Sequence, residues 1–286
     1  MQTFAIALLA AALYGTAYVT THFALRHMDA VSGARVSVPS ACLLFWLLSP
    51  ALDWSAWNAK AAAIFALVGL FYPALVTLLI FAANRRLGPT ISGAIGSTTP
   101  LFAVLGAAAF LNEAFGAAEL AGTAAIVVGT VALSRPADSG GARIRRGSLW
   151  LPWSAALLRS GAQLLSKAGL VLWPSPLAAV LAGYTVSTAA LWAAGLFGAA
   201  RARARFTRNG VAWFAVTGIV NGCALLATYW ALATGPVHVV SPVVATYPLF
   251  TLLLSALLLR RERLDSRLLA GVALTVAGVV TFAARQ

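Results

Sequence analysis

The chain has 286 residues, of which 61% are hydrophobic and only 9% are charged. A soluble globular protein carries roughly 25% charged residues, because its surface must face water. The 20 basic and 7 acidic residues are too few to cover such a surface, which excludes a soluble fold of this size. The net charge of +13 raises nucleic acid as a partner. The basic residues, however, form short clusters between apolar segments, where membrane topology explains them, so we expect no nucleic-acid partner.

Ten apolar segments of roughly spanning length follow one another along the chain. About 20 helical residues cross the hydrocarbon core of a bilayer. The apolar start of the chain lacks a basic region before it, so we interpret it as the first span and not as a signal peptide. The predicted spans are residues 3–25, 34–52, 61–83, 88–111, 115–134, 149–171, 177–199, 210–233, 236–259 and 267–284.

Gly-Pro pairs mark two of the predicted connections. Gly88-Pro89 falls within residues 84–89, between the third and fourth spans, and Gly235-Pro236 separates the eighth from the ninth. A Gly-Pro pair favours a helix stop followed by a helix start. The longest polar stretch is predicted to link two halves of the protein. The predicted parts are a first five-helix repeat over 1–134, a linker over 135–148 and a second repeat over 149–286.

The basic residues predict the orientation. With ten spans, connections alternate between the two sides of the membrane, and sixteen of the 20 basic residues fall in the odd-numbered connections. The side that holds the termini receives only Lys60 and Arg285. Because cytoplasmic loops are enriched in Lys and Arg, we expect the odd-numbered connections in the cytoplasm. The predicted location is the cell membrane, and in a bacterium the inner membrane, with a multi-pass topology.

The two halves share an ordered series of landmarks at offsets of 147 to 149 residues. Each half has five spans, an odd number, so the second copy must enter the membrane from the opposite side. Inverted repeats of this kind are a common transporter plan, with the substrate site between the copies. The sequence therefore predicts an all-α membrane protein whose ten transmembrane helices form two inverted five-helix repeats. The matched landmarks are Gly69 with Gly218, Gly88-Pro89 with Gly235-Pro236, Pro100-Leu101-Phe102 with Pro248-Leu249-Phe250, Glu113 with Glu262, Gly122 with Gly271, and Gly129 with Gly278.

With this plan, the sequence resembles the ten-helix EamA-type family of the drug/metabolite transporter superfamily. The resemblance rests also on the fourth-span pattern, which runs from Ser97-Thr98-Thr99-Pro100-Leu101-Phe102 to Asn112-Glu113, and on its ninth-span copy. It implies a secondary transporter, often an exporter of amino acids or other metabolites, with a central cavity lined by both halves. One departure is that the glycine usual before the motif glutamate is replaced by Asn112 and Arg261, which affects a loop rather than the cavity.

The sixth predicted span carries three polar residues in one stripe. Arg159, Gln163 and Lys167 are spaced at i, i+4 and i+8, which places them along one helix face. A charge at mid-membrane costs roughly 2.5–3.5 kcal/mol on insertion scales, so Arg159 should face the bundle interior. We expect it to bind an anionic group of the substrate; the alternative is a structural bond to backbone carbonyls. For Lys167 the alternative is snorkelling to the membrane surface.

Further candidate residues lie in the first, third and eighth spans. Tyr14, Tyr18 and His22 form a similar stripe in the first span, which we expect to line the cavity. The alternative is that the two tyrosines pack at a helix interface and that His22 lies near the membrane surface. His22 is the candidate if protons are coupled, because histidine titrates near neutral pH; facilitated diffusion is equally open. Asn221 can instead join helices by hydrogen bonds. The predicted substrate-binding residues are Tyr14, Tyr18, His22, Tyr72, Arg159, Gln163, Lys167, Asn221 and Tyr229.

The carboxylates narrow the expected substrate. All seven lie at or near span ends, so none is expected at mid-membrane to pair with a cationic drug. An interior arginine with tyrosines nearby favours a solute with a carboxylate or phosphate and an apolar or aromatic part. Cys42 and Cys223 are 181 positions apart in apolar segments and predict no disulfide. We expect no metal and no cofactor.

These observations predict a secondary transporter that exports amino acids or related carboxylate-bearing solutes by alternating access. Other organic anions or phosphate esters are the alternative substrates. A lipid-modifying membrane enzyme is the alternative of a different class, but no metal spacing and no GxSxG motif support it, so we predict that the protein is not an enzyme. A channel is a third class, but it would need a selectivity filter or a ring of like polar side chains, which the sequence does not indicate. The fused repeats can form a pathway alone, so the expected state is a monomer in the bilayer.

Overall fold

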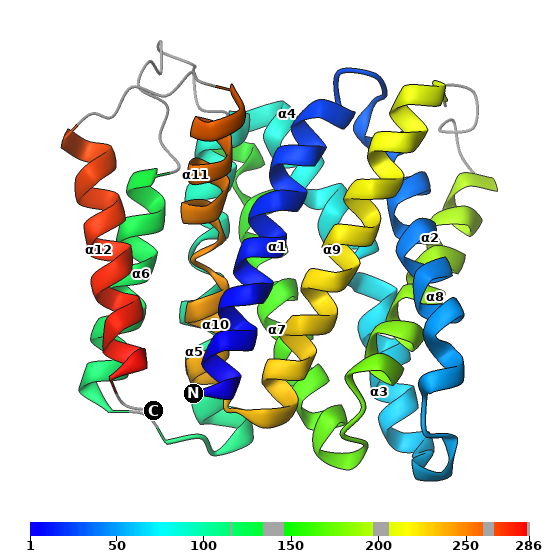
Figure 1. Ribbon diagram of the computed structural model, residues 1–286, viewed down its shortest axis with the longest axis horizontal. Helices are drawn as coiled ribbons and strands as arrows, with labels where there is room; N and C mark the ends of the chain where they lie inside the picture. Colours follow the sequence, from blue (N-terminus) through cyan, green and yellow to red (C-terminus); the bar gives the residue numbers. More distant parts are fainter. Residues whose placement is uncertain (115, 134–145, 197–205, 260–265, 285–286) are drawn as a thin grey trace.

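The computed structural model describes residues 1–114, 116–133, 146–196, 206–259 and 266–284, and every regular element within them is a helix (Figure 1). Short 3-10 turns, η1 to η3, cover Ser49–Ala51, Trp54–Ala56 and Arg146–Ser148. The α-helices are α1 Gln2–Ala24, α2 Ala30–Leu48, α3 Ala59–Phe71, α4 Ala74–Gly96, α5 Thr99–Leu111, α6 Ala117–Leu133, α7 Trp150–Leu172, α8 Pro176–Leu196, α9 Arg208–Thr234, α10 Val237–Val244, α11 Tyr247–Leu259 and α12 Ser266–Ala283.

The predicted all-α membrane architecture of ten spans is confirmed. Seven spans are single helices, and the other three are divided: α3 with the start of α4, the end of α4 with α5, and α10 with α11. Large apolar side chains such as Phe110, Leu257 and Val171 are 79%, 75% and 71% exposed. So much apolar surface needs lipid around it. Most of the predicted linker lies outside the described residues.

One predicted connection is wrong and another is confirmed. Residues 84–89 do not form a loop, because the backbone of α4 stays helical from Ala74 to Gly96. The Gly-Pro pair opposes a helix at two positions only, and the residues before it, from Ala74 to Leu87, are mostly good helix formers. At the second pair, α9 ends at Thr234, Gly235 is extended, and α10 begins at Val237.

The packing of α6 against α12 shows that the repeats are inverted. These helices lie side by side at one edge of the bundle, and α1 begins at the end of the bundle where α12 ends (Figure 1). A Cβ atom on Gly278 would lie 2.7 Å from the carbonyl oxygen of Gly122, and one on Gly129 would lie 2.8 Å from that of Gly271. The sequence aligns Gly122 with Gly271 and Gly129 with Gly278, so exchanging the copies converts one contact into the other. That exchange is the relation expected of an antiparallel, two-fold related pair.

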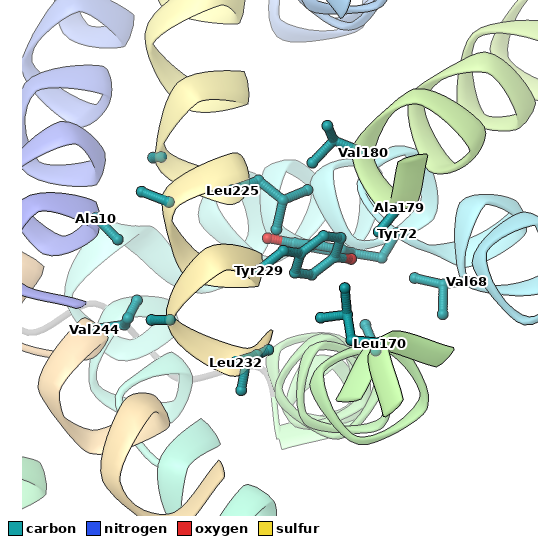
Figure 2. Close-up of a cluster of buried hydrophobic side chains, with 14 of the residues drawn as sticks. Ala10, Val68, Tyr72, Leu170, Ala179, Val180, Leu225, Tyr229, Leu232 and Val244 are labelled. Carbon is teal, nitrogen blue, oxygen red and sulfur yellow. The ribbon is translucent and has the colours of Figure 1, made fainter. Parts of the chain in front are cut away.

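Helices of opposite halves also form the interior. α1 packs on α9, α10 and α11, while α7 packs on α3, α4 and α5. Figure 2 shows the buried cluster where they meet, with the rings of Tyr72 and Tyr229 between Leu170 and Leu225. Tyr72 and Tyr229 are 8% and 3% exposed. Tyr72, Leu225, Tyr229 and Val244 of this cluster border the space between the two halves.

Candidate functional site

A cavity of about 550 Å³, counting its open part, lies between the two halves. The residues that line it come from both repeats: from α1, the α3–α4 break, α4 and α5 in the first, and from α7, α9, α10 and α11 in the second. Its walls mix aromatic, apolar and polar side chains. The lining residues are Tyr14, Tyr18, Tyr72, Gly96, Thr99, Pro100, Arg159, Ala162, Gln163, Leu225, Thr228, Tyr229, Ser241, Val244, Ala245 and Tyr247.

Helix breaks position much of this lining. The α4–α5 break lies between Gly96 and Thr99, and the α10–α11 break between Val244 and Tyr247. All four of these residues line the cavity, and the sequence repeat pairs Gly96 with Val244 and Thr99 with Tyr247. The proline of each Pro-Leu-Phe motif stands in the first turn of the new helix, where its missing N–H is harmless. The motif thus places matched breaks on the two sides of the cavity, a usual arrangement in transporters.

Arg159 carries the charge of the cavity. It lines the cavity together with Tyr14, Tyr18, Tyr72 and Tyr247, which all lie within electrostatic range of its guanidinium. No carboxylate occurs among the described lining residues, and the contact between Glu113 and His238 lies outside them. The phenolic groups are neutral hydrogen-bonding partners, so they leave the positive charge uncompensated. The cavity is therefore electropositive and suited to an anionic group.

Tyrosines build the wall that faces Arg159. The rings of Tyr18 and Tyr247 stack with centroids 4.9 Å apart and planes 3° from parallel. Tyr14 meets Tyr247 edge-on at 6.4 Å, and its hydroxyl lies 3.3 Å from that of Tyr72. Such stacked and edge-on pairs favour a fixed ring arrangement. The wall offers a flat aromatic surface beside a cation.

Six of the nine predicted binding residues line this cavity: Tyr14, Tyr18, Tyr72, Arg159, Gln163 and Tyr229. The main omission from the prediction is Tyr247, which stacks on Tyr18 and faces Arg159. Its signal was present, because it directly precedes the proline of the second Pro-Leu-Phe motif, at the position that Thr99 holds in the first. Ser241, two turns earlier in the same span, was also left out.

Three predicted binding residues lie elsewhere. His22 is near the end of α1, where its Nε2 lies 3.2 Å from a guanidinium nitrogen of Arg26. Asn221 donates its amide N–H to the hydroxyl of buried Tyr184 at 3.3 Å, joining α9 to α8. Both positions agree with the alternatives that the sequence left open for them.

Lys167 holds the connection between α9 and α10. Its ammonium donates to the carbonyl oxygens of Leu232 and Gly235 at 2.7 and 2.8 Å. The last carbonyls of a helix have no partner within the helix, and a cation there is favourable. Lys167 therefore caps the end of α9, which neither prediction for this residue had included.

Glu113 holds the other side of the same connection. Its carboxylate accepts hydrogen bonds from the backbone N–H groups of Val237 and His238, at 2.9 and 3.1 Å, and lies 3.0 Å from Nδ1 of His238. These bonds satisfy the first N–H groups of α10. Asn112, just before, is left-handed with φ of 51°. Asparagine tolerates this conformation better than most residues, which explains how it replaces the glycine usual here.

The pH dependence of stability should report on Glu113. Burial raises the pKa of this carboxyl, but hydrogen bonds from His238 and the backbone outweigh it and hold the pKa below its ordinary value of 4.5. Because folding lowers this pKa, the ionised carboxylate contributes fully to stability above pH 4.5, the ordinary pKa. The contribution is lost as the pH falls through the pKa of the folded state. We expect Glu113→Gln to lower the melting temperature at pH 7, with a smaller difference from wild type below pH 4.5. A difference that does not change between pH 7 and pH 4 would contradict this role.

Comparison with known proteins agrees with this geometry. The model of the EamA-like transporter family matches residues 2–135 and again 147–284. A solved structure described only as "Crystal structure of protein" superposes with a TM-score of 0.81, covering 100% of this chain and 99% of that chain at 19% identity. At that identity the likeness concerns the fold. No curated protein matches the sequence.

Two inverted five-helix repeats around a central cavity define a membrane transporter of small molecules. The family match covers nearly the whole chain as two copies, so the chain belongs to the EamA-like transporter family.

Proposed function

We propose that this transporter carries solutes with a carboxylate group, amino acids first among them, through the cavity between its repeats. The observation that supports the proposal is the guanidinium of Arg159, which lines the cavity without a carboxylate beside it among the described residues. A guanidinium forms paired hydrogen bonds with a carboxylate, and such charge-assisted bonds are about twice as strong as neutral ones. The substrate would supply the missing negative charge.

The tyrosine wall supports a substrate with an apolar or aromatic part. Tyr18 and Tyr247 present stacked rings beside the cation, and Leu225, Val244 and Ala245 add apolar surface to the same cavity. Transport by alternating access, in the export direction, follows the plan of the family and the breaks that flank the cavity. The cavity is complete within one chain, so a monomer suffices, and a transporter of this design needs no enzymatic step.

Transport by purified protein in liposomes tests this proposal. The panel should include amino acids, other organic acids, phosphate esters and organic cations, each as a radiolabelled solute. We expect amino acids to cross fastest and cations to cross no faster than in protein-free liposomes. Phosphate esters crossing faster than amino acids would favour the alternative substrates, since a guanidinium binds phosphate as well. Lipid breakdown without solute movement would replace the transporter by a membrane enzyme.

A further inference from the structure

Two hydrogen-bonding atoms in the cavity wall have no partner among the described residues: Oε1 of Gln163 and Oγ of Ser241. Both atoms are buried, and the whole of Ser241 is only 2% exposed. Buried polar atoms in proteins are almost always hydrogen-bonded, so each exception calls for an explanation. Here both exceptions belong to residues that line a space between the two halves.

Other polar side chains of the wall are already engaged. The hydroxyls of Thr99 and Thr228 donate to the carbonyl oxygens of Gly96 and Ala224, at 2.7 and 2.8 Å. Tyr14 and Tyr72 face each other at 3.3 Å. Gln163 and Ser241 are therefore distinguished from the rest of the wall by an unused hydrogen-bonding capacity.

The position of these two residues relative to Arg159 indicates what they bind. Gln163 follows Arg159 by one turn of α7, so the two side chains are neighbours on one face. Ser241 lies on α10, which packs against α7. A solute whose carboxylate meets Arg159 therefore brings its adjacent atoms to Gln163 and Ser241. In an amino acid the adjacent group is the ammonium, which has three N–H donors and no acceptor.

We infer that Gln163 and Ser241 form an acceptor subsite for the α-ammonium group, and that this subsite selects amino acids over carboxylic acids without an amine. The inference rests on the proposed function and adds to it the residues that bind the ammonium group of the substrate. An amine-free acid would bind Arg159 but leave both acceptors unpaired. A site built to bond a substrate group discriminates strongly against analogues without it, for the same reason.

Pairs of solutes that differ only in the amine provide the test. Phenylalanine is compared with 3-phenylpropanoate, and leucine with 4-methylpentanoate, in liposomes holding wild-type protein, Gln163→Leu or Ser241→Ala. We expect wild type to transport the amino acids about 10- to 100-fold faster, as the loss of one or two hydrogen bonds to a charged group implies. Each variant should bring this ratio close to one.

Thr188→Val is the matched control. The hydroxyl of Thr188 is also buried without a partner, but it belongs to α8, which contributes nothing to the described cavity lining. This variant should keep the wild-type ratio. Melting temperatures without solute provide a second readout. Removing an unpaired polar atom leaves stability unchanged or raises it, so Gln163→Leu and Ser241→Ala should not melt earlier than wild type.

The possible results separate the inference from the proposed function. Equal transport of both members of each pair by wild type, or an unchanged ratio in both variants, overturns the subsite while carboxylate transport stands. If no member of either pair crosses and none raises the melting temperature of wild type, the proposed function itself fails. Should a variant not fold, the wild-type ratio and the melting shifts with each solute still decide, because they need no variant.

Discussion

Arg159→Gln should lower the transport of a carboxylate-bearing solute by at least about 100-fold. The substitution removes the positive charge in the described cavity wall but keeps a polar, though shorter, side chain. Two charge-assisted hydrogen bonds contribute about 1.5–3 kcal/mol each, and every 1.4 kcal/mol is a factor of ten. The measurement is initial uptake of labelled solute into liposomes that contain equal amounts of folded protein.

Lys167→Met is the matched control for this prediction. Lys167 lies on the same face of α7, two turns further along, but its ammonium bonds the carbonyls of Leu232 and Gly235. Its loss leaves two partly buried carbonyl groups without this hydrogen-bond donor, so we expect a lower melting temperature with transport that persists. Arg159→Lys should keep part of the activity, because an ammonium retains the charge without the paired geometry. Full transport by Arg159→Gln would refute the role of the arginine.

Gly218→Ala should destabilise the protein severely. A Cβ atom there would overlap the backbone of Ser37 on α2, at 2.6 Å from its Cα and its carbonyl carbon. Backbone atoms cannot rotate aside, so α9 and α2 must separate. Overpacking usually costs about 1–3 kcal/mol, and a backbone overlap belongs at the upper end of that range or above it. Thermal melting in detergent measures the effect.

Gly161→Ala is the control, because a Cβ atom on Gly161 of α7 would meet nothing within 4 Å. Its melting temperature should match wild type or exceed it, since alanine favours a helix by up to about 1 kcal/mol over glycine. The repeat counterpart of Gly218 offers a further check. A Cβ atom on Gly69 would lie 2.6 Å from the carbonyl oxygen of Gly183, so Gly69→Ala should also destabilise. Equal melting of Gly218→Ala and Gly161→Ala would show that this interface tolerates separation.

The ten spans and the inverted repeat were predictable from the sequence alone. Apolar runs report helix length directly, because lipid imposes a nearly fixed span. The Pro-Leu-Phe copies and the matched glycines mark the same structural positions in both halves. The interior position of Arg159 was also predictable, since a charge at membrane depth is stable only away from lipid.

Only the tertiary structure decided which polar side chains share the cavity. Lys167 lies on the same stripe as Arg159 and Gln163, yet it caps α9, because the end of α9 lies within reach of its ammonium group. Tyr247 belongs to the site because α11 is packed against α1, where Tyr18 stands. Periodicity shows which residues share a face of one helix, whereas the neighbours of that face depend on contacts between helices far apart in the chain. That the side-chain oxygens of Gln163 and Ser241 have no hydrogen-bond partner among the described residues likewise depends on where all their neighbours lie.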